Sequence, residues 1–159
     1  MQMDLEAAVH RYGNAILKYC YGILCDYHEA QDARQETFIK AYAKRAAYED
    51  QGVMGAWLYK IAYRTCLNML RKKRFMPWGG EAQKEASYEM GDDLVSHDIK
   101  AALSFLPPKD RALVYSRAVE GMDYNQLESL YGTSAATLRK RYERAKKKLE
   151  ARLSEAGYP

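Results

Sequence analysis

Positive charge is concentrated in two separated segments of the 159-residue sequence. Residues 60–76 carry six basic side chains and no acid, and residues 137–152 carry eight basic side chains against two acids, so each segment has a net charge of +6. Lysine and arginine at this density bind phosphate oxygens. The pattern therefore favours a polyanionic ligand that contacts the protein at both basic segments. The alternative for each segment is a solvated basic helix face without a ligand.

Aromatic residues accompany the first basic segment: Tyr48, Trp57, Tyr59 and Tyr63. Unstacked bases rest on aromatic rings beside a cationic strand path, so this mixture favours single-stranded DNA. Tyr48 and Arg64 are expected to contact bases, whereas Trp57 is expected to face the core. The chain has 14 tyrosines, and chance clustering is therefore the alternative.

Helices must position these side chains, because apolar residues recur at spacings of three and four over most of the chain. The first domain is expected to contain helices over about 4–24, as one helix or two broken near Gly13, then about 29–47 and 54–74. Residues 77–98 have a net charge of −5 and little periodicity, which predicts a flexible acidic linker. The expected organisation is a domain at 1–76, a linker at 77–97 and a second domain at 98–159, giving an all-α fold.

The second domain contains a helix-turn-helix pattern. Two short helices on either side of Pro107 and Pro108 are followed by a helix over 124–131, the turn Gly132-Thr133-Ser134, and a long C-terminal helix with Ser or Thr as its N-cap. The second helix of such a motif enters the major groove of DNA. Its expected exposed residues are Arg139, Lys140, Glu143 and Arg144. Glu143 could accept a hydrogen bond from a cytosine amino group, although pairing with Arg139 or Lys147 along the helix is favoured here.

Several other functions have little support in the sequence. Cys20, Cys25 and Cys66 form an odd set without dense spacing, which predicts reduced thiols and disfavours a zinc site. Scattered histidines and the lack of a phosphate-binding glycine loop predict no catalytic residue, no cofactor and no small-molecule substrate. An acidic start and the absence of a long apolar run predict no signal peptide, no membrane insertion and a cytoplasmic location, at the nucleoid when bound to polymerase.

Several short motifs resemble those of extracytoplasmic-function (ECF) sigma factors of the sigma-70 type. Residues 30–38 (AQDARQETF) are similar to the second region of these proteins, and residues 57–62 (WLYKIA) are similar to their promoter-melting helix. Leu106-Pro107 with Arg111, and residues 134–141 (SAATLRKR) followed by Arg144-Ala145, resemble the fourth region. The resemblance covers about 10–76 and 98–153, in the order that the family has.

The resemblance implies a function in transcription initiation. The first domain, as sigma region 2, would bind core RNA polymerase at the clamp helices of its largest subunit through Asp32, Gln35, Glu36 and Phe38. It would contact the −10 promoter element through Tyr48, Lys60, Arg64, Asn68 and Arg71. The second domain, as sigma region 4, would bind the polymerase flap and contact the −35 element through Arg139, Lys140, Arg141, Glu143 and Arg144. The family also implies an anti-sigma factor as a regulatory partner.

The chain departs from the family pattern at a few positions that bear on promoter sequence. Arg64 stands where asparagine is usual, Asn68 where aspartate is common, and residues 126–128 (QLE) where Glu-Ile-Ala is typical. Two other functions remain alternatives. One is a helix-turn-helix regulator that binds an operator without polymerase, and the other is a helical interaction protein whose basic faces are only solvated.

Overall fold

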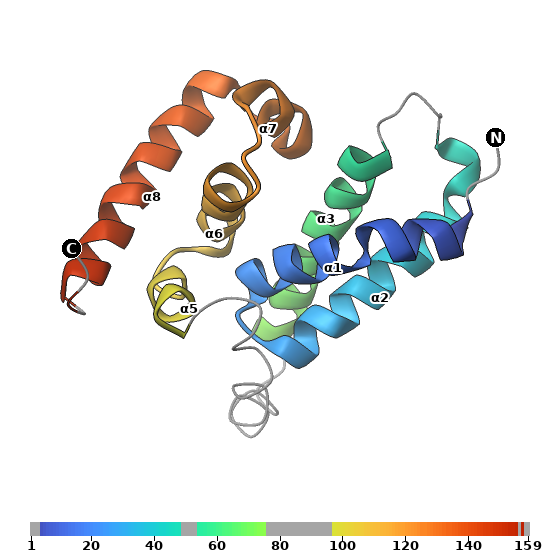
Figure 1. Cartoon of the computed structure of the whole chain (residues 1–159), viewed down its shortest axis with the longest axis horizontal. Coiled ribbons are helices and arrows are strands. Elements are labelled where there is room, and N and C mark those ends of the chain that lie inside the picture. The colour runs from blue at the N-terminus through green and yellow to red at the C-terminus, as the bar shows by residue number, and fades with distance from the viewer. Residues whose placement is uncertain (1–3, 49–53, 76–96, 156, 158–159) are drawn as a thin grey trace. The chain divides into compact units, whose positions relative to one another are not determined.

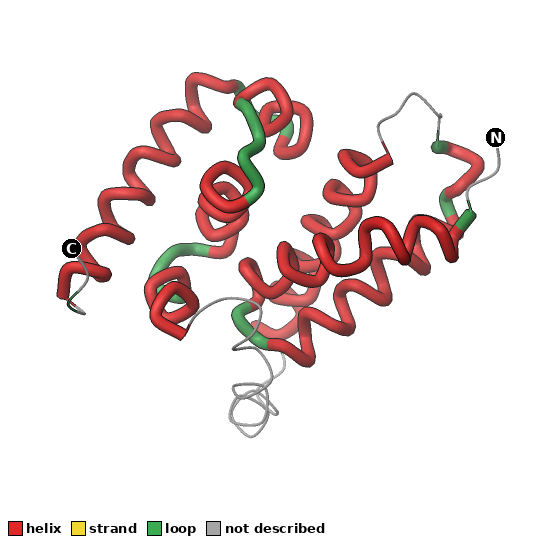
Figure 2. Tube along the Cα trace, in the orientation of Figure 1, coloured by secondary structure: helices red, strands yellow, loops and turns green. Residues whose placement is uncertain are grey.

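The computed structural model describes residues 4–48, 54–75, 97–155 and 157, and every regular element within these ranges is a helix (Figures 1 and 2). The prediction of an all-α fold is thus confirmed. Contacts divide the chain into two compact units, Met1–Gly91 (unit 1) and Asp92–Pro159 (unit 2). The division falls within the segment predicted as the acidic linker, of which residues 77–96 lie outside the described residues.

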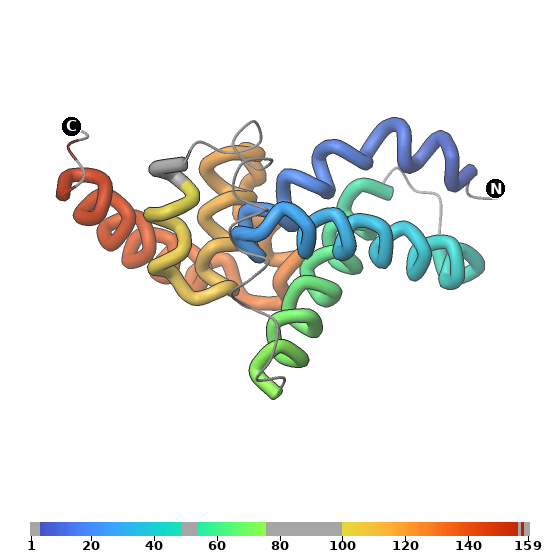
Figure 3. Tube along the Cα trace, turned by 90° about the horizontal axis from the view of Figure 1, so that it is seen from below, coloured from blue at the N-terminus to red at the C-terminus, as the bar shows by residue number. Residues whose placement is uncertain are grey.

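In the described part of unit 1, three long helices form a bundle: α1 (Leu5–Leu24), α2 (Tyr27–Ala43) and α3 (Met54–Arg74), each in contact with the other two (Figure 3). α1 runs without a break through Gly13, which decides between the one-helix and two-helix alternatives. The helix expected over 29–47 begins two residues earlier and ends at Ala43, and a short 3-10 turn, η1 (Arg45–Ala47), follows it.

The connection between α1 and α2 consists of two residues, Cys25 and Asp26. Cys25 adopts the left-handed conformation with φ of 57°, and its N–H donates to the carbonyl oxygen of Tyr21 at 2.8 Å. Asp26 then caps α2, because its Oδ1 accepts a hydrogen bond of 2.9 Å from the N–H of Glu29. An N-cap of this type contributes about 1 kcal/mol, so the two residues end one helix and begin the next without a longer loop.

The core of unit 1 lies where the three helices meet. Tyr19 of α1 is fully buried and meets the ring of Tyr59 of α3 edge to face at 4.9 Å. Cys20 of α1 and Cys66 of α3 are also fully buried. A hydrogen bond with Cys20, together with burial, raises the pKa of the Cys66 thiol well above its usual value. The Cys66 thiol therefore remains protonated, and both cysteines pack as small apolar core residues.

Within its described residues, unit 2 contains five helical segments: α5 (His97–Leu103), α6 (Pro108–Val114), the π-helical turn η2 (Tyr115–Val119), α7 (Tyr124–Tyr131) and α8 (Ala135–Glu155). These residues form two core clusters. Leu103, Leu106 and Val114 pack against Ala145 in the first, and Leu113 packs with Leu127 and Leu138 in the second. α8 contributes to both clusters and thus holds the other helices of unit 2 together.

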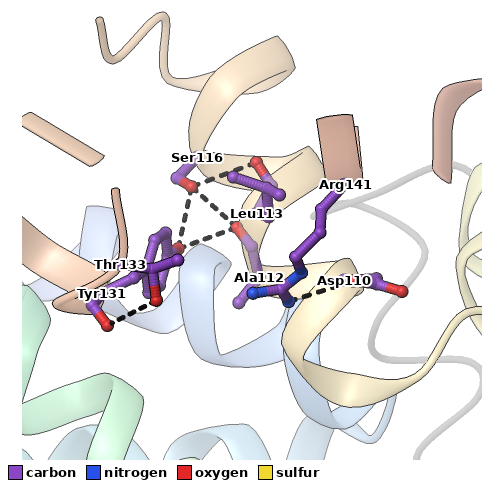
Figure 4. A network of polar contacts seen from close by, with 7 residues as sticks. All are labelled: Asp110, Ala112, Leu113, Ser116, Tyr131, Thr133 and Arg141. Carbon is purple, nitrogen blue, oxygen red and sulfur yellow. Dashed lines mark hydrogen bonds and ion pairs between the residues drawn. The ribbon is translucent and has the colours of Figure 1, made fainter. Parts of the chain in front are cut away.

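A network of hydroxyl groups joins the end of α7 to α6 and η2 (Figure 4). The Tyr131 hydroxyl donates to the carbonyl oxygen of Ala112 at 3.0 Å and lies 2.8 Å from Ser116 Oγ. Ser116 Oγ also bonds back to the carbonyl of Ala112 at 2.8 Å. Side chains that bond to carbonyls of the preceding turn favour local distortion of a helix, which fits the π-helical turn at this point.

Burial of Tyr115 predicts a loss of stability at alkaline pH. Its side chain is nearly inaccessible, and this desolvation, with a smaller contribution from Glu120, raises its pKa to about 12. Because the folded pKa exceeds the unfolded value of about 10, the contribution to stability is present below pH 10 and is lost as pH rises toward 12. Unit 2 should therefore lose roughly 2–3 kcal/mol over this interval through Tyr115.

Urea unfolding of Tyr115→Phe and of the wild type, followed across this pH range, would test this expectation. The difference in free energy of unfolding between Tyr115→Phe and the wild type should change with pH across this range. Parallel curves for Tyr115→Phe would contradict the assignment.

Candidate nucleic-acid and protein interfaces

The turn between α7 and α8 is built as a helix-turn-helix connection. Gly132 ends α7 with φ of 63°, a left-handed conformation that glycine adopts without strain. Ser134 Oγ then accepts a hydrogen bond of 3.3 Å from the N–H of Thr137, as expected for the N-cap. Glu128 of α7 accepts a second bond, of 2.9 Å, from the N–H of Ala135. A carboxylate at this position also interacts favourably with the positive end of the α8 dipole. α7 thus fixes the start of α8.

Four of the residues predicted to contact the −35 element lie on one exposed face of α8. Arg139, Lys140, Glu143 and Arg144 are all exposed and, with Ala136, line one shallow depression. Their side chains offer donors for guanine and phosphate and one carboxylate acceptor. This face can therefore contact both base edges and the DNA backbone.

Glu143 is not paired within its helix. The expected ion pair with Arg139 or Lys147 is absent from the described part of the chain. Arg139 instead places its guanidinium over the ring of Tyr124, 4.6 Å from the ring centroid. The prediction of intrahelical pairing was wrong, because Arg139 has an aromatic partner on α7 that spacing along α8 does not reveal.

Arg141 faces the interior of unit 2 rather than the exposed face. Its Nη2 lies 3.1 Å from Asp110 Oδ1 near the start of α6, and both side chains are about one-quarter exposed (Figure 4). Arg141 is three residues from Leu138 and four from Ala145, which are buried, so it shares their side of the helix. Its placement thus indicates that it ties α8 to α6. It does not belong to the exposed residues of α8 that are proposed to contact DNA.

In unit 1, one stripe of α3 collects the predicted −10 residues. Trp57, Lys60, Arg64, Asn68 and Arg71 follow one another at spacings of three or four, the pattern of a single helix face. Arg64 and Arg71 are exposed, and Arg71 Nη2 donates to Asn68 Oδ1 at 2.9 Å. The basic residue Lys73 lies outside this stripe and forms an ion pair with Glu29 of α2 at 2.9 Å. One positive charge of the segment 60–76 is thus neutralised within unit 1.

Tyr48 lies at one end of this stripe. Its ring centroid is 5.1 Å from that of Trp57, with an angle of 31° between the planes. Trp57 is only partly buried, so the expectation that it faces the core was wrong. The two rings form a partly exposed aromatic pair next to Lys60 and Arg64, the kind of surface on which a base can stack.

The acidic residues of α2 form a second candidate interface. Asp32 and Gln35 are exposed, and Glu36 is partly exposed and pairs with Lys40 at 3.1 Å. Phe38, predicted as a member of this set, is only 5% exposed because it shares the inner side of α2 with Thr37 and Ala41. The exposed apolar residue of this surface is Ile39, which is 67% exposed and lies seven residues after Asp32.

The described residues contain no group of three or more histidine, cysteine or acidic side chains arranged to hold a metal ion. Within the same residues, none of the helices is both long enough and apolar enough to cross a membrane.

Both units match models of the same protein family. The model described as Sigma-70 region 2 matches residues 8–76, and the model described as Sigma-70, region 4 matches residues 96–149. The chain belongs to the sigma-70 family. The first match contains the α2 and α3 surfaces of unit 1, and the second contains the helix-turn-helix of unit 2.

Curated relatives of this sigma-70 chain carry names of the ECF type. ECF RNA polymerase sigma factor SigE of Mycolicibacterium smegmatis is 26% identical over 153 residues, covering 91% of this chain and 59% of the relative. SigG of Mycobacterium tuberculosis is 27% identical over 177 residues, covering 92% of this chain and 48% of the relative. SigW of Bacillus subtilis is 24% identical over 158 residues, covering 89% of this chain and 84% of the relative. The chain thus spans about half to three fifths of the first two relatives, and its recognition as an ECF member of the family is confirmed.

Two solved structures share the fold. The sigma factor RpoE in complex with the anti-sigma factor NepR, from Bartonella quintana, has a TM-score of 0.74 and 19% identity over 94% of this chain and 96% of that chain. CnrH in complex with the cytosolic domain of CnrY has a TM-score of 0.72 and 21% identity, covering 96% of this chain and 88% of that chain. At these identities the likeness establishes the two-domain helical fold of the sigma-70 chain.

Three residues at the candidate interfaces were not assigned a role from the sequence: Ile39, Tyr124 and Glu128. Trp57 was named with the aromatic residues of the first basic segment but was assigned to the core. The positions of Ile39 and Trp57 could have been recognised by counting helix turns from Asp32 and Lys60. The contacts of Tyr124 with Arg139 and of Glu128 with Ala135 join α7 to α8, and no single-helix pattern signals them.

Proposed function

We propose that the chain acts as an ECF sigma factor, which binds core RNA polymerase and directs it to promoters. The observation that carries the proposal is that a cationic helix lies in each of the two matched sigma-70 regions, in family order. In this role the chain recruits and positions DNA and catalyses nothing. No cofactor, metal ion or small-molecule substrate is required, and the place of action is the cytoplasm.

Unit 1 supplies the polymerase-binding and −10 surfaces in this proposal. The exposed side of α2, with Asp32, Gln35, Glu36 and Ile39, binds the clamp helices of the largest polymerase subunit. The exposed stripe of α3 lies along one strand of the separated promoter DNA. A base released from the duplex stacks against the Tyr48–Trp57 pair. Extruding a base costs only a few kcal/mol, which stacking and the contacts of Arg64 and Arg71 can offset.

Unit 2 supplies the −35 surface. α8 enters the major groove with Arg139, Lys140, Glu143 and Arg144 toward the bases, and Lys146, Lys147 and Lys148 contact phosphates. The same unit binds the polymerase flap. Each DNA surface alone is small, and core polymerase raises affinity by holding both against one promoter.

An anti-sigma factor is proposed as the regulator. RpoE of Bartonella quintana, which shares the fold, is named in complex with the anti-sigma factor NepR. A partner of this kind would cover the exposed α2 side and thereby keep the chain from polymerase.

Mixing the full chain with sigma-free bacterial core polymerase tests the proposal. The two should co-elute as one complex, and selection of random duplex DNA by this complex should recover sites with two separated elements. The chain alone should select no such sequence. Tight, specific DNA binding by the chain without polymerase, and no complex with it, would instead identify a stand-alone helix-turn-helix regulator.

A further inference from the structure

Tyr124, the first residue of α7, lies between two arginines from different elements of unit 2. The guanidinium of Arg139 of α8 is 4.6 Å from the centroid of its ring, and that of Arg117 of η2 is 5.1 Å away. Both distances are within the range in which a cation is attracted to an aromatic face. The ring thus links the exposed face of α8 to the segment that precedes α7.

The ring of Tyr124 is itself held in place. It packs against the core cluster of Leu113, Leu127 and Leu138. Its backbone begins at a capping box, in which Asp123 Oδ1 accepts from the N–H of Gln126 at 2.8 Å and Gln126 Oε1 accepts from the N–H of Asp123 at 2.9 Å. Tyr124 is therefore a fixed platform rather than a mobile surface ring.

Arg117 is fixed on the same platform. Its Nη1 donates to the carbonyl oxygen of Met122 at 3.1 Å, across the turn that leads into α7. Its charge therefore stays close to the ring and to the start of α7. Two guanidinium groups beside one ring make this end of the α8 face strongly attractive to an anionic or acceptor-rich partner.

Arg139 keeps its donors available. It is exposed, and in the described part of the chain no hydrogen bond or ion pair occupies its N–H groups. A cation–π contact uses the flat face of the guanidinium and leaves its edge, which carries the donors, for a ligand. A free arginine loses much rotamer freedom when it binds, whereas a side chain already held against a ring loses less.

We infer that Tyr124 is a positioning residue, which holds Arg139 in the orientation from which it contacts the −35 duplex. The inference rests on the proposed function, since it concerns the DNA surface of α8. The inference goes beyond the proposed function because it assigns a role in DNA affinity and base selection to a residue of α7, which lies outside the exposed α8 face.

A double-mutant cycle tests the inference with holoenzyme assembled from the full chain and core polymerase. Tyr124→Leu and Tyr124→Met remove the ring but keep an apolar side chain, and both should weaken binding to the selected promoter roughly 3- to 10-fold. Tyr124→Phe keeps the ring and should stay within about 2-fold of the wild type. In an Arg139→Gln background, neither Tyr124→Leu nor Tyr124→Met should weaken binding further, because the side chain that the ring positions is gone.

Base selection gives a readout that a purely structural role would not change. The base pair at which Arg139→Gln relaxes selection should be the same pair at which Tyr124→Leu relaxes it. Melting curves of unit 2 accompany each variant, and Tyr124→Met replaces Tyr124→Leu if the latter unfolds at the assay temperature.

The outcomes separate the inference from the proposed function. A wild-type holoenzyme that binds no −35 element overturns both. A normal wild-type holoenzyme overturns the inference alone if the effects of the Tyr124 and Arg139 changes simply add, or if Tyr124→Phe is as damaging as Tyr124→Leu.

Discussion

Asp32→Arg combined with Glu36→Arg is expected to abolish co-elution of the chain with core RNA polymerase, with a loss of affinity of at least about 100-fold. The acidic side chains of this α2 side favour a basic partner surface, and juxtaposed like charges at an interface cost several kcal/mol. Both positions are at the surface of α2, so the helix itself tolerates the change. Size-exclusion chromatography and a binding titration with core polymerase would measure the effect.

The two positions should contribute unequally. Glu36 already pairs with Lys40, whose Nζ also donates to Thr65 Oγ1 at 3.4 Å, whereas no ion pair in the described residues involves Asp32. Asp32→Arg should therefore have the larger effect of the two single changes. Glu150→Arg reverses an exposed charge on α8 and serves as the matched control, which should bind polymerase normally. Wild-type affinity of the Asp32→Arg, Glu36→Arg double variant would exclude this side of α2 as the docking surface.

Leu138→Ala is expected to destabilise unit 2 and to leave the stability of unit 1 unchanged. Leu138 is fully buried and packs with Leu113 and Leu127, so the change removes a large part of a small core. Leucine-to-alanine changes at such sites cost about 2–5 kcal/mol. For a unit of this size, the melting temperature should fall by roughly 10–20 °C.

The sequence provides a way to follow the units separately. Trp57 and Trp78, the two tryptophans, both belong to unit 1, whereas circular dichroism follows the helices of both units. Leu138→Ala should lower the circular dichroism transition of unit 2 and leave the fluorescence transition unchanged. Leu149→Ala, at a partly buried position of the same helix, should have a smaller effect. A melting temperature of unit 2 equal to that of the wild type would show that Leu138 is not central to its core.

Helix positions were predictable from the sequence because their causes are local. The apolar spacing of α1 and α3 and the Gly-Thr-Ser turn before α8 place these elements within about two residues of their observed ends. The direction of a side chain depends on the phase of its helix, which a motif match does not contain. Phe38 and Arg141 belong to family-like motifs, and yet both turn inward because buried neighbours share their side of the helix.

The contacts between helices were the least predictable part of the candidate interfaces. Glu128 caps α8 from α7, Arg139 stacks on Tyr124, and Lys73 pairs with Glu29 across more than forty residues of sequence. Each depends on packing that brings two helices together, and none follows from spacing along one helix. These contacts also change the chemistry, since they decide which charges remain available to DNA or polymerase.

The placement of the three thiols offers a practical route to observing the chain at work. Cys20 and Cys66 are shielded within the bundle, whereas Cys25 is partly accessible in the turn between α1 and α2. A maleimide dye should therefore attach to the unaltered protein at one position. Because Cys25 lies in unit 1, such a dye, paired with a second one on promoter DNA, would report by energy transfer how unit 1 approaches the DNA as transcription begins.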